Sequence, residues 1–108
     1  LEKWNGTCPV TKSKIKSILI SSHILPWSQC NDEQKLDVDN GILLSPNVDS
    51  LFDKYLISFS NDGFLIKSSK ITDEDLNLLG VDKDVQIPIN DGMKKYLEIH
   101  RKKLNEFN

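Results

Sequence analysis

This sequence of 108 residues lacks several features that mark other classes of protein. No apolar run approaches the roughly 18 residues of a membrane-spanning helix, so we expect no membrane segment. The two cysteines, Cys8 and Cys30, lie far apart, and neither has a second cysteine or a histidine at metal-ligand spacing. Their arrangement argues against a structural zinc and favours reduced thiols in a cytoplasmic protein.

An excess of positive charge is also missing, because the formal net charge is −2. A free-standing nucleic-acid binder usually carries a basic footprint, so this balance argues against that class. The charge is nevertheless uneven, with acids clustered in 32–39 and 72–84. The basic clusters are Lys12, Lys14 and Lys16 near the start and Lys94, Lys95, Arg101, Lys102 and Lys103 near the end. These residues either form a patch that meets DNA or are the solvated sides of their elements.

The sequence begins at Leu1 without an initiator methionine and without a charged leader before an apolar stretch. We therefore expect no secretory signal, and a single domain over residues 1–108 that is part of a larger protein. The 38% hydrophobic and 28% charged residues are typical of a globular domain with one core.

The first half of the chain predicts two strands joined by a long loop. Residues 15–23 alternate Lys and Ser with Ile and Leu, which indicates a strand ending at His23, before Pro26. Residues 28–39 are polar and acidic and predict a surface loop with a helical turn around 32–36. The Asn40-Gly41 turn signal and the apolar run 42–44 then predict a second strand that pairs with the first.

The second half predicts three helices and a hairpin. The first helix starts at Ser45-Pro46, and its apolar face comprises Val48, Leu51, Phe52 and Tyr55. A hairpin of 56–60 and 64–68 turns at Asn61-Asp62-Gly63, and a capping box of Thr72 and Asp75 opens a short helix that stops at Gly80. Met93, Tyr96, Leu97, His100, Leu104 and Phe107 describe one face of a final helix. We expect His100 to be a core or interface residue.

Three stretches of the sequence carry a family resemblance. SSHILPW, NGILLSPNVDSLFDK and YLISFSNDG are similar to the HNH endonuclease family, in the branch found as nuclease domains of bacterial restriction-type enzymes. CPVT near the start and YLEIHRKKL near the end extend the likeness over nearly the whole chain. The resemblance implies an α+β fold, with a ββα-metal core at 15–55, an added β-hairpin and a C-terminal helix.

The resemblance also assigns the site residues. His23 matches the motif's histidine, Asn40 its asparagine, and Asp49 its third position, nine residues after the asparagine. An imidazole can take a proton from water near neutral pH, so His23 is the predicted general base. The alternative for His23 is a half-buried strand histidine bonded to backbone. Asn40 is expected to tie the two strand ends together, which overlaps with the role of an ordinary turn asparagine.

Asp49 and Asp53 are four residues apart, so their carboxylates share a helix face. Like charges at that spacing repel unless a cation offsets them, and carboxylate oxygens suit Mg²⁺ or Mn²⁺. We expect both aspartates to bind one divalent metal ion, with Asn47 as a reserve ligand and no small-molecule cofactor. The alternatives are a favourable contact of Asp49 with the helix dipole and a salt bridge or cap for Asp53.

These assignments predict a metal-dependent DNA endonuclease of restriction type, acting as a homodimer or fused to a DNA-recognition domain. The resemblance implies products with 5′-phosphate and 3′-hydroxyl ends. The rival is a catalytically inactive DNA-binding or interaction domain with the same fold. It is supported by Asp49, which replaces the third-position histidine, and by Ser22, which stands where the wider family often has an acidic ligand.

Overall fold

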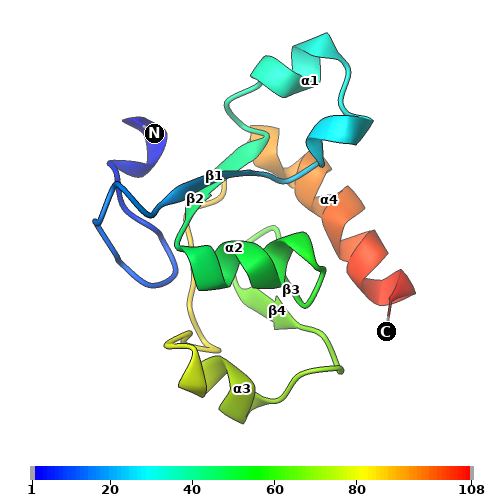
Figure 1. Ribbon diagram of the computed structural model, residues 1–108. Coiled ribbons are helices and arrows are strands. Elements are labelled where there is room, and N and C mark those ends of the chain that lie inside the picture. Colours follow the sequence, from blue (N-terminus) through cyan, green and yellow to red (C-terminus); the bar gives the residue numbers. More distant parts are fainter. Residues whose placement is uncertain (1, 108) are drawn as a thin grey trace.

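The computed structural model describes residues 2–107, which form two small antiparallel sheets and four α-helices (Figure 1). The elements in chain order are η1 (Glu2–Trp4), β1 (Ile20–His23), η2 (Trp27–Gln29), α1 (Asp32–Leu36), β2 (Gly41–Leu44), α2 (Pro46–Asp53), β3 (Ile57–Phe59), β4 (Leu65–Lys67), α3 (Asp73–Leu78) and α4 (Asp91–Glu106). In this part of the chain, no helix combines the length and the apolar character needed to cross a membrane. The α+β fold predicted from the sequence is confirmed.

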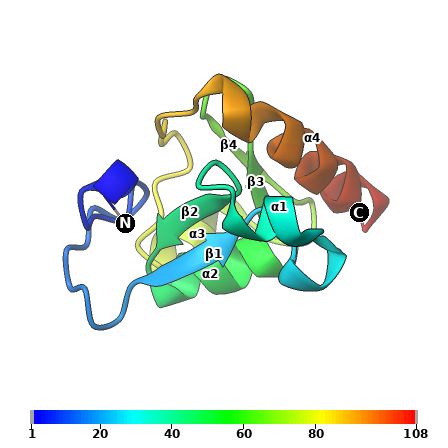
Figure 2. The same cartoon turned by 90° about the horizontal axis from the view of Figure 1, so that it is seen from above.

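β1 and β2 form the first sheet, with His23 opposite Gly41 and Ile20 opposite Leu44. β1 lies across α2, while the N-terminal segment and α4 flank this unit on opposite sides (Figure 2). The predicted strand over 15–23 was too long, because residues 16–18 form a turn. Pairing sets this limit, since β2 gives way to α2 right after Leu44 and offers no partner to residues before Ile20.

Helix α2 packs against β1 on one side and β3 on the other. It ends in a Schellman motif, in which Leu56 N donates to Leu51 O (2.9 Å) and Tyr55 N donates to Phe52 O (3.1 Å). Tyr55 takes the left-handed position, with φ 58°, where glycine is the usual residue. The prediction that Tyr55 continues the helix face was therefore wrong, because α2 ends at Asp53.

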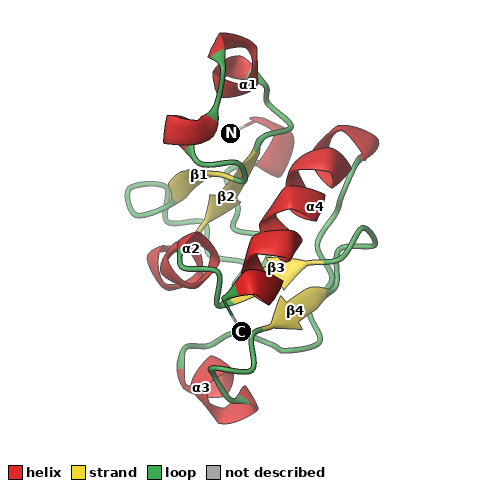
Figure 3. Ribbon diagram, turned by 90° about the vertical axis from the view of Figure 1, so that its right-hand side faces the viewer, coloured by secondary structure: helices red, strands yellow, loops and turns green. Residues whose placement is uncertain are grey.

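The β3–β4 hairpin forms the second sheet, and α4 packs along β3 (Figure 3). The predicted Asp-Gly turn is present, and Gly63 has φ 90°. A Cβ at Gly63 would collide with the carbonyl oxygen of Ile87, whose N–H donates to Gly63 O at 2.9 Å. Glycine is required there by both conformation and space.

Helix α4 is fixed to α2 through His100, which is buried as predicted. Its ring stacks on Phe52 with a centroid distance of 3.8 Å. Nε2 lies 2.8 Å from Phe52 O, and a carbonyl only accepts, so Nε2 carries the proton. Nδ1 then accepts from the Ser58 hydroxyl at 2.8 Å. His100 thus satisfies a carbonyl at the end of α2 and ties three elements together.

We expect acid to weaken the fold through His100. Burial lowers the pKa of this imidazole from 6.5 to about 4, so the folded protein keeps it neutral while the unfolded chain protonates. The free energy of unfolding therefore falls as the pH drops from 6.5 to 4, by about 3 kcal/mol over the whole window. Urea unfolding at pH 7, 5.5 and 4 will show a shallower fall for His100→Gln than for the wild type. Parallel curves for the two proteins would contradict this assignment.

Candidate active site

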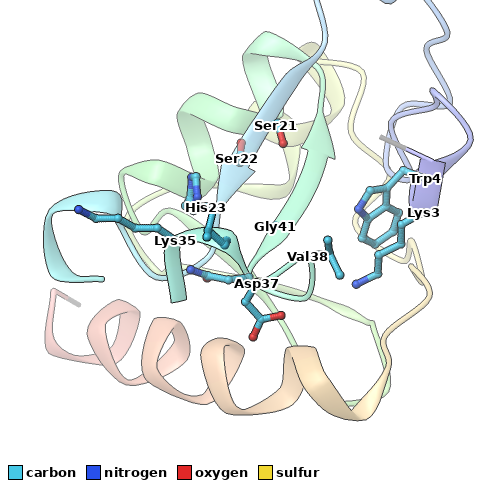
Figure 4. Close-up of a pocket in the computed structure, with 11 residues that line it drawn as sticks. Lys3, Trp4, Ser21, Ser22, His23, Lys35, Asp37, Val38 and Gly41 are labelled. Atoms are coloured by element: carbon cyan, nitrogen blue, oxygen red, sulfur yellow. The ribbon is translucent and has the colours of Figure 1, made fainter. Parts of the chain in front are cut away.

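A cavity of about 670 Å³ lies at the end of β1 where His23 stands (Figure 4). Ser21, His23 and Gly41 contribute to it from the β1–β2 sheet. Further residues come from η1, from the end of α1 and from the connection between α1 and β2, and include Trp4, Lys35 and Val38. The cavity therefore combines an imidazole with side chains from three separate segments of the chain.

His23 is half-buried, and its ring meets the Trp27 ring edge-on, with centroids 5.4 Å apart and planes at 73°. Within residues 2–107, no hydrogen bond holds either ring nitrogen of His23. The alternative of a strand histidine bonded to backbone does not describe this arrangement. The imidazole is held on one side by an aromatic contact, and its nitrogens are free to bind water or a substrate.

Asn40 is almost completely buried behind His23. Its Oδ1 accepts from Leu25 N at 2.8 Å, and its Nδ2 donates to Gln34 O and to Cys30 Sγ, each at 3.3 Å. The Cys30 thiol in turn donates to Leu25 O at 3.2 Å. The amide therefore joins both ends of the long loop that starts directly after His23, as its predicted tying role requires.

Asp49 lies beneath β1, on the α2 side of the sheet. Its Oδ1 accepts a hydrogen bond from the Ser22 hydroxyl, so the carboxylate is held beside the residue that precedes His23. Asp53 follows one helical turn later and is exposed. His23 and Asn40 line the cavity, whereas neither aspartate does; Asp49 reaches β1 through Ser22.

The two predicted carboxylate ligands would not surround a metal ion on all sides. Among residues 2–107, no group of three or more His, Cys, Asp or Glu side chains is arranged to hold a metal ion. One or two carboxylates with retained waters are the usual protein donors to Mg²⁺, and Asp49 and Asp53 fit that pattern. The reserve ligand Asn47 is already engaged, because its Oδ1 accepts from the Ser45 hydroxyl at 3.0 Å and its Nδ2 donates to Leu79 O at 2.6 Å.

Some residues around the cavity were not predicted as part of a site. Trp27 contacts His23 but remains 56% exposed. The Lys35 ammonium lies 4.7 Å from the centre of the Trp27 ring, a cation–π distance. Lys3 reaches the cavity from the chain start. The short distance in sequence from His23 to Trp27 was the only available signal for this cluster.

A comparison with known families covers the same part of the chain. Residues 8–60 match the family described as HNH endonuclease. This segment of the chain belongs to the HNH endonuclease family. No protein of curated function is similar enough to count as a match.

The matched segment includes all elements from β1 through β3 and contains His23, Asn40, Asp49 and Asp53. β1, β2 and α2 are the two strands and the helix of the HNH core, and α4 is an addition beyond the match. Membership indicates a nuclease-type function, in a family that generally uses a divalent metal ion.

Proposed function

We propose that this domain is a metal-dependent endonuclease that hydrolyses phosphodiester bonds in DNA, as the cleavage domain of a restriction-type enzyme. The observation that carries the proposal is the arrangement of side chains at the end of β1. There His23 presents free ring nitrogens to an open cavity, and the neighbouring Ser22 holds the Asp49 carboxylate. The imidazole on β1 and the carboxylate on α2 thus approach adjacent residues of one strand end, which supports roles as base and metal ligand.

His23 takes a proton from the attacking water in this proposal. The edge contact with Trp27 restrains the ring, and the amide of Asn40 fixes the backbone that follows it. A base whose position is fixed before the substrate binds loses less entropy on reaching the reactive geometry. Asn40 is therefore a positioning residue, because it acts through the loop and not on the substrate.

Asp49 and Asp53 are the residues that would hold the cation. When bound, a divalent ion supplies charge stabilisation to the scissile phosphate and the leaving oxygen. The placement of Asp53 favours such a role, because a carboxylate in the last turn of α2 is opposed by the helix dipole and by Asp49 one turn away. A cation between the two side chains would offset both repulsions.

Cleavage of supercoiled plasmid DNA tests this function. We expect nicking with Mg²⁺ or Mn²⁺ and none with EDTA, because the carboxylates alone repel the phosphate. EDTA should leave the melting temperature unchanged, because a continuous apolar core stabilises the fold without a metal. Cooperative unfolding on chelation would reveal a structural metal and contradict this account.

A second candidate function is a DNA-binding or interaction domain that has lost catalysis. It is favoured by the aspartate at the third motif position and by Ser22, a neutral residue before His23. It predicts DNA binding that is independent of divalent ions, with no nicking under any condition. Plasmid nicking by the wild type, lost with EDTA, would exclude it.

A further inference from the structure

The segment Leu36–Asp39, which we name the aliphatic loop, runs from the last residue of α1 towards β2. Its apolar side chains are exposed, and its charged side chains are half-buried. Its apolar and charged residues alternate, and the apolar ones point to solvent: Leu36 is 83% exposed and Val38 is 75% exposed. The intervening carboxylates, Asp37 and Asp39, are directed inward and are half-buried. The hydrophobic effect would favour buried aliphatic side chains and exposed carboxylates.

Asp37 fixes the centre of the aliphatic loop to α4. It accepts a hydrogen bond from the Tyr96 hydroxyl at 2.6 Å and another from Asp39 N at 2.9 Å, and Figure 4 shows it pointing towards the helix. The bond from Tyr96 lowers the pKa of Asp37. Burial, together with the same bond, raises the pKa of Tyr96 to about 12. The carboxylate therefore stays ionised and the hydroxyl stays a donor across the neutral range.

Asp39 fixes the end of the aliphatic loop. It accepts from Lys3 Nζ and from Asn90 Nδ2, each at 2.9 Å, at the N-terminus of α4. The packing is close, because a Cβ added at Gly92 would run into this carboxylate. Both anchors bind residues distant in sequence, so the outward direction of Leu36 and Val38 is imposed by the fold.

Leu36 and Val38 also line the cavity that contains His23. Single exposed apolar side chains are common, but these two lie on an anchored segment beside the candidate active site. Lys3 and Lys35 line the same cavity; Lys3 is paired with Asp39, so Lys35 provides the positive charge that a phosphate beside the aliphatic pair would meet. Two aliphatic side chains on an anchored backbone, beside Lys35, suit a ligand with apolar base faces and anionic phosphates.

We propose that Leu36 and Val38 form a wedge that inserts at a base step of duplex DNA and unstacks it beside the bond presented to His23. The inference rests on the proposed function, because the DNA is taken to be the substrate of that site. Unstacking a base step costs a few kcal/mol, which contacts made by the opened duplex repay. The wedge makes the duplex deformable where His23 needs access to the backbone.

Leu36→Ser and Val38→Ser test the wedge, with Leu78→Ser as the matched control, because Leu78 on α3 is 73% exposed and does not line the cavity. The first measurement is permanganate oxidation of thymines in duplex DNA bound by each protein in EDTA, since unstacked thymines react faster. The second is cleavage with Mg²⁺ of a fully paired duplex and of one with mismatches. Both can be made on the same set of four proteins.

We expect reactive thymines with the wild type and Leu78→Ser but not with the two loop variants. The loop variants should cut the paired duplex about ten-fold or more slowly, yet cut mismatched DNA at the wild-type rate, because the mismatch supplies the unstacking. An unchanged permanganate pattern would overturn the wedge. So would an equal loss of rate on both duplexes, or loss of self-association in the loop variants, which would mark an interface between copies.

Failure of the proposed function gives a different result from failure of the wedge. If the wild type cuts no DNA, the nuclease proposal fails, but permanganate reactivity in EDTA still decides the wedge. Thymines that react with the wild type but not with the loop variants would support the wedge as part of a DNA-binding domain. If no thymine reacts with the wild type, the wedge is overturned. If the wild type cuts DNA and the loop variants match it in both measurements, only the wedge fails.

Discussion

Replacing His23 by alanine will abolish nicking of plasmid DNA while leaving the melting temperature nearly unchanged. A general base contributes about 10²- to 10⁴-fold to rate, and among residues 2–107 no other histidine lines this cavity. The ring is half-buried, and its aromatic contact is with the exposed Trp27. Removing the imidazole ring should therefore lower the free energy of unfolding little, compared with the loss of a core side chain.

Ser21→Ala is the matched control for this substitution, because Ser21 lies on the same strand, is exposed and lines the same cavity. It should nick plasmid at the wild-type rate. Adding imidazole to His23→Ala should restore part of the activity if the missing group is a base. Wild-type cleavage by His23→Ala would contradict the general-base assignment outright.

The pH dependence of activity needs a structural control, because the fold itself weakens in acid through His100. Rates below pH 6.5 should be compared at a temperature at which circular dichroism shows the protein to be folded. An acid decrease in rate that persists there is separate from the unfolding of the domain.

Local chemistry explains which parts of the fold could be predicted from the sequence. The short helix at 32–36 and the helix that Thr72 opens were both correctly placed, because their caps lie within a few residues of each helix. The strand over 15–23 was wrong because strand length depends on a partner. β2 is cut short by the start of α2, and no alternation within residues 15–23 carries that information.

The same distinction between local and distant causes applies to the residues of the site. His23 and Asn40 could be related before the structure, because a turn signal and a strand end fix their mutual placement. The aliphatic loop could not be found, since alternation of Leu, Asp, Val and Asp is typical of a strand with its apolar side inward. Only Tyr96, Lys3 and Asn90, which are distant in sequence, determine that the carboxylates turn inward.

Removing the charge of Asp49 will slow cleavage by about 10²- to 10³-fold, the scale of a lost electrostatic contact at a reacting group. Asp49→Asn is well suited to this test because its Oδ1 can still accept the Ser22 hydroxyl, so the geometry below β1 is kept. Single-turnover rates at saturating DNA will separate this loss from any change in binding. Binding without metal should be equal or slightly tighter, because a carboxylate near the phosphate has gone.

Asp53→Asn separates a metal ligand from a surface acid at the other end of α2. As a surface acid in the last helical turn, Asp53 is unfavourable, so its neutralisation would raise the melting temperature and leave the rate unchanged. As a metal ligand, its neutralisation would slow cleavage, by less than that of Asp49, and raise the Mg²⁺ concentration needed for half-maximal rate. If both aspartate variants cut and bind as the wild type does, the cation is held elsewhere. The i and i+4 carboxylates of α2 would then be solvated side chains that only share a helix face.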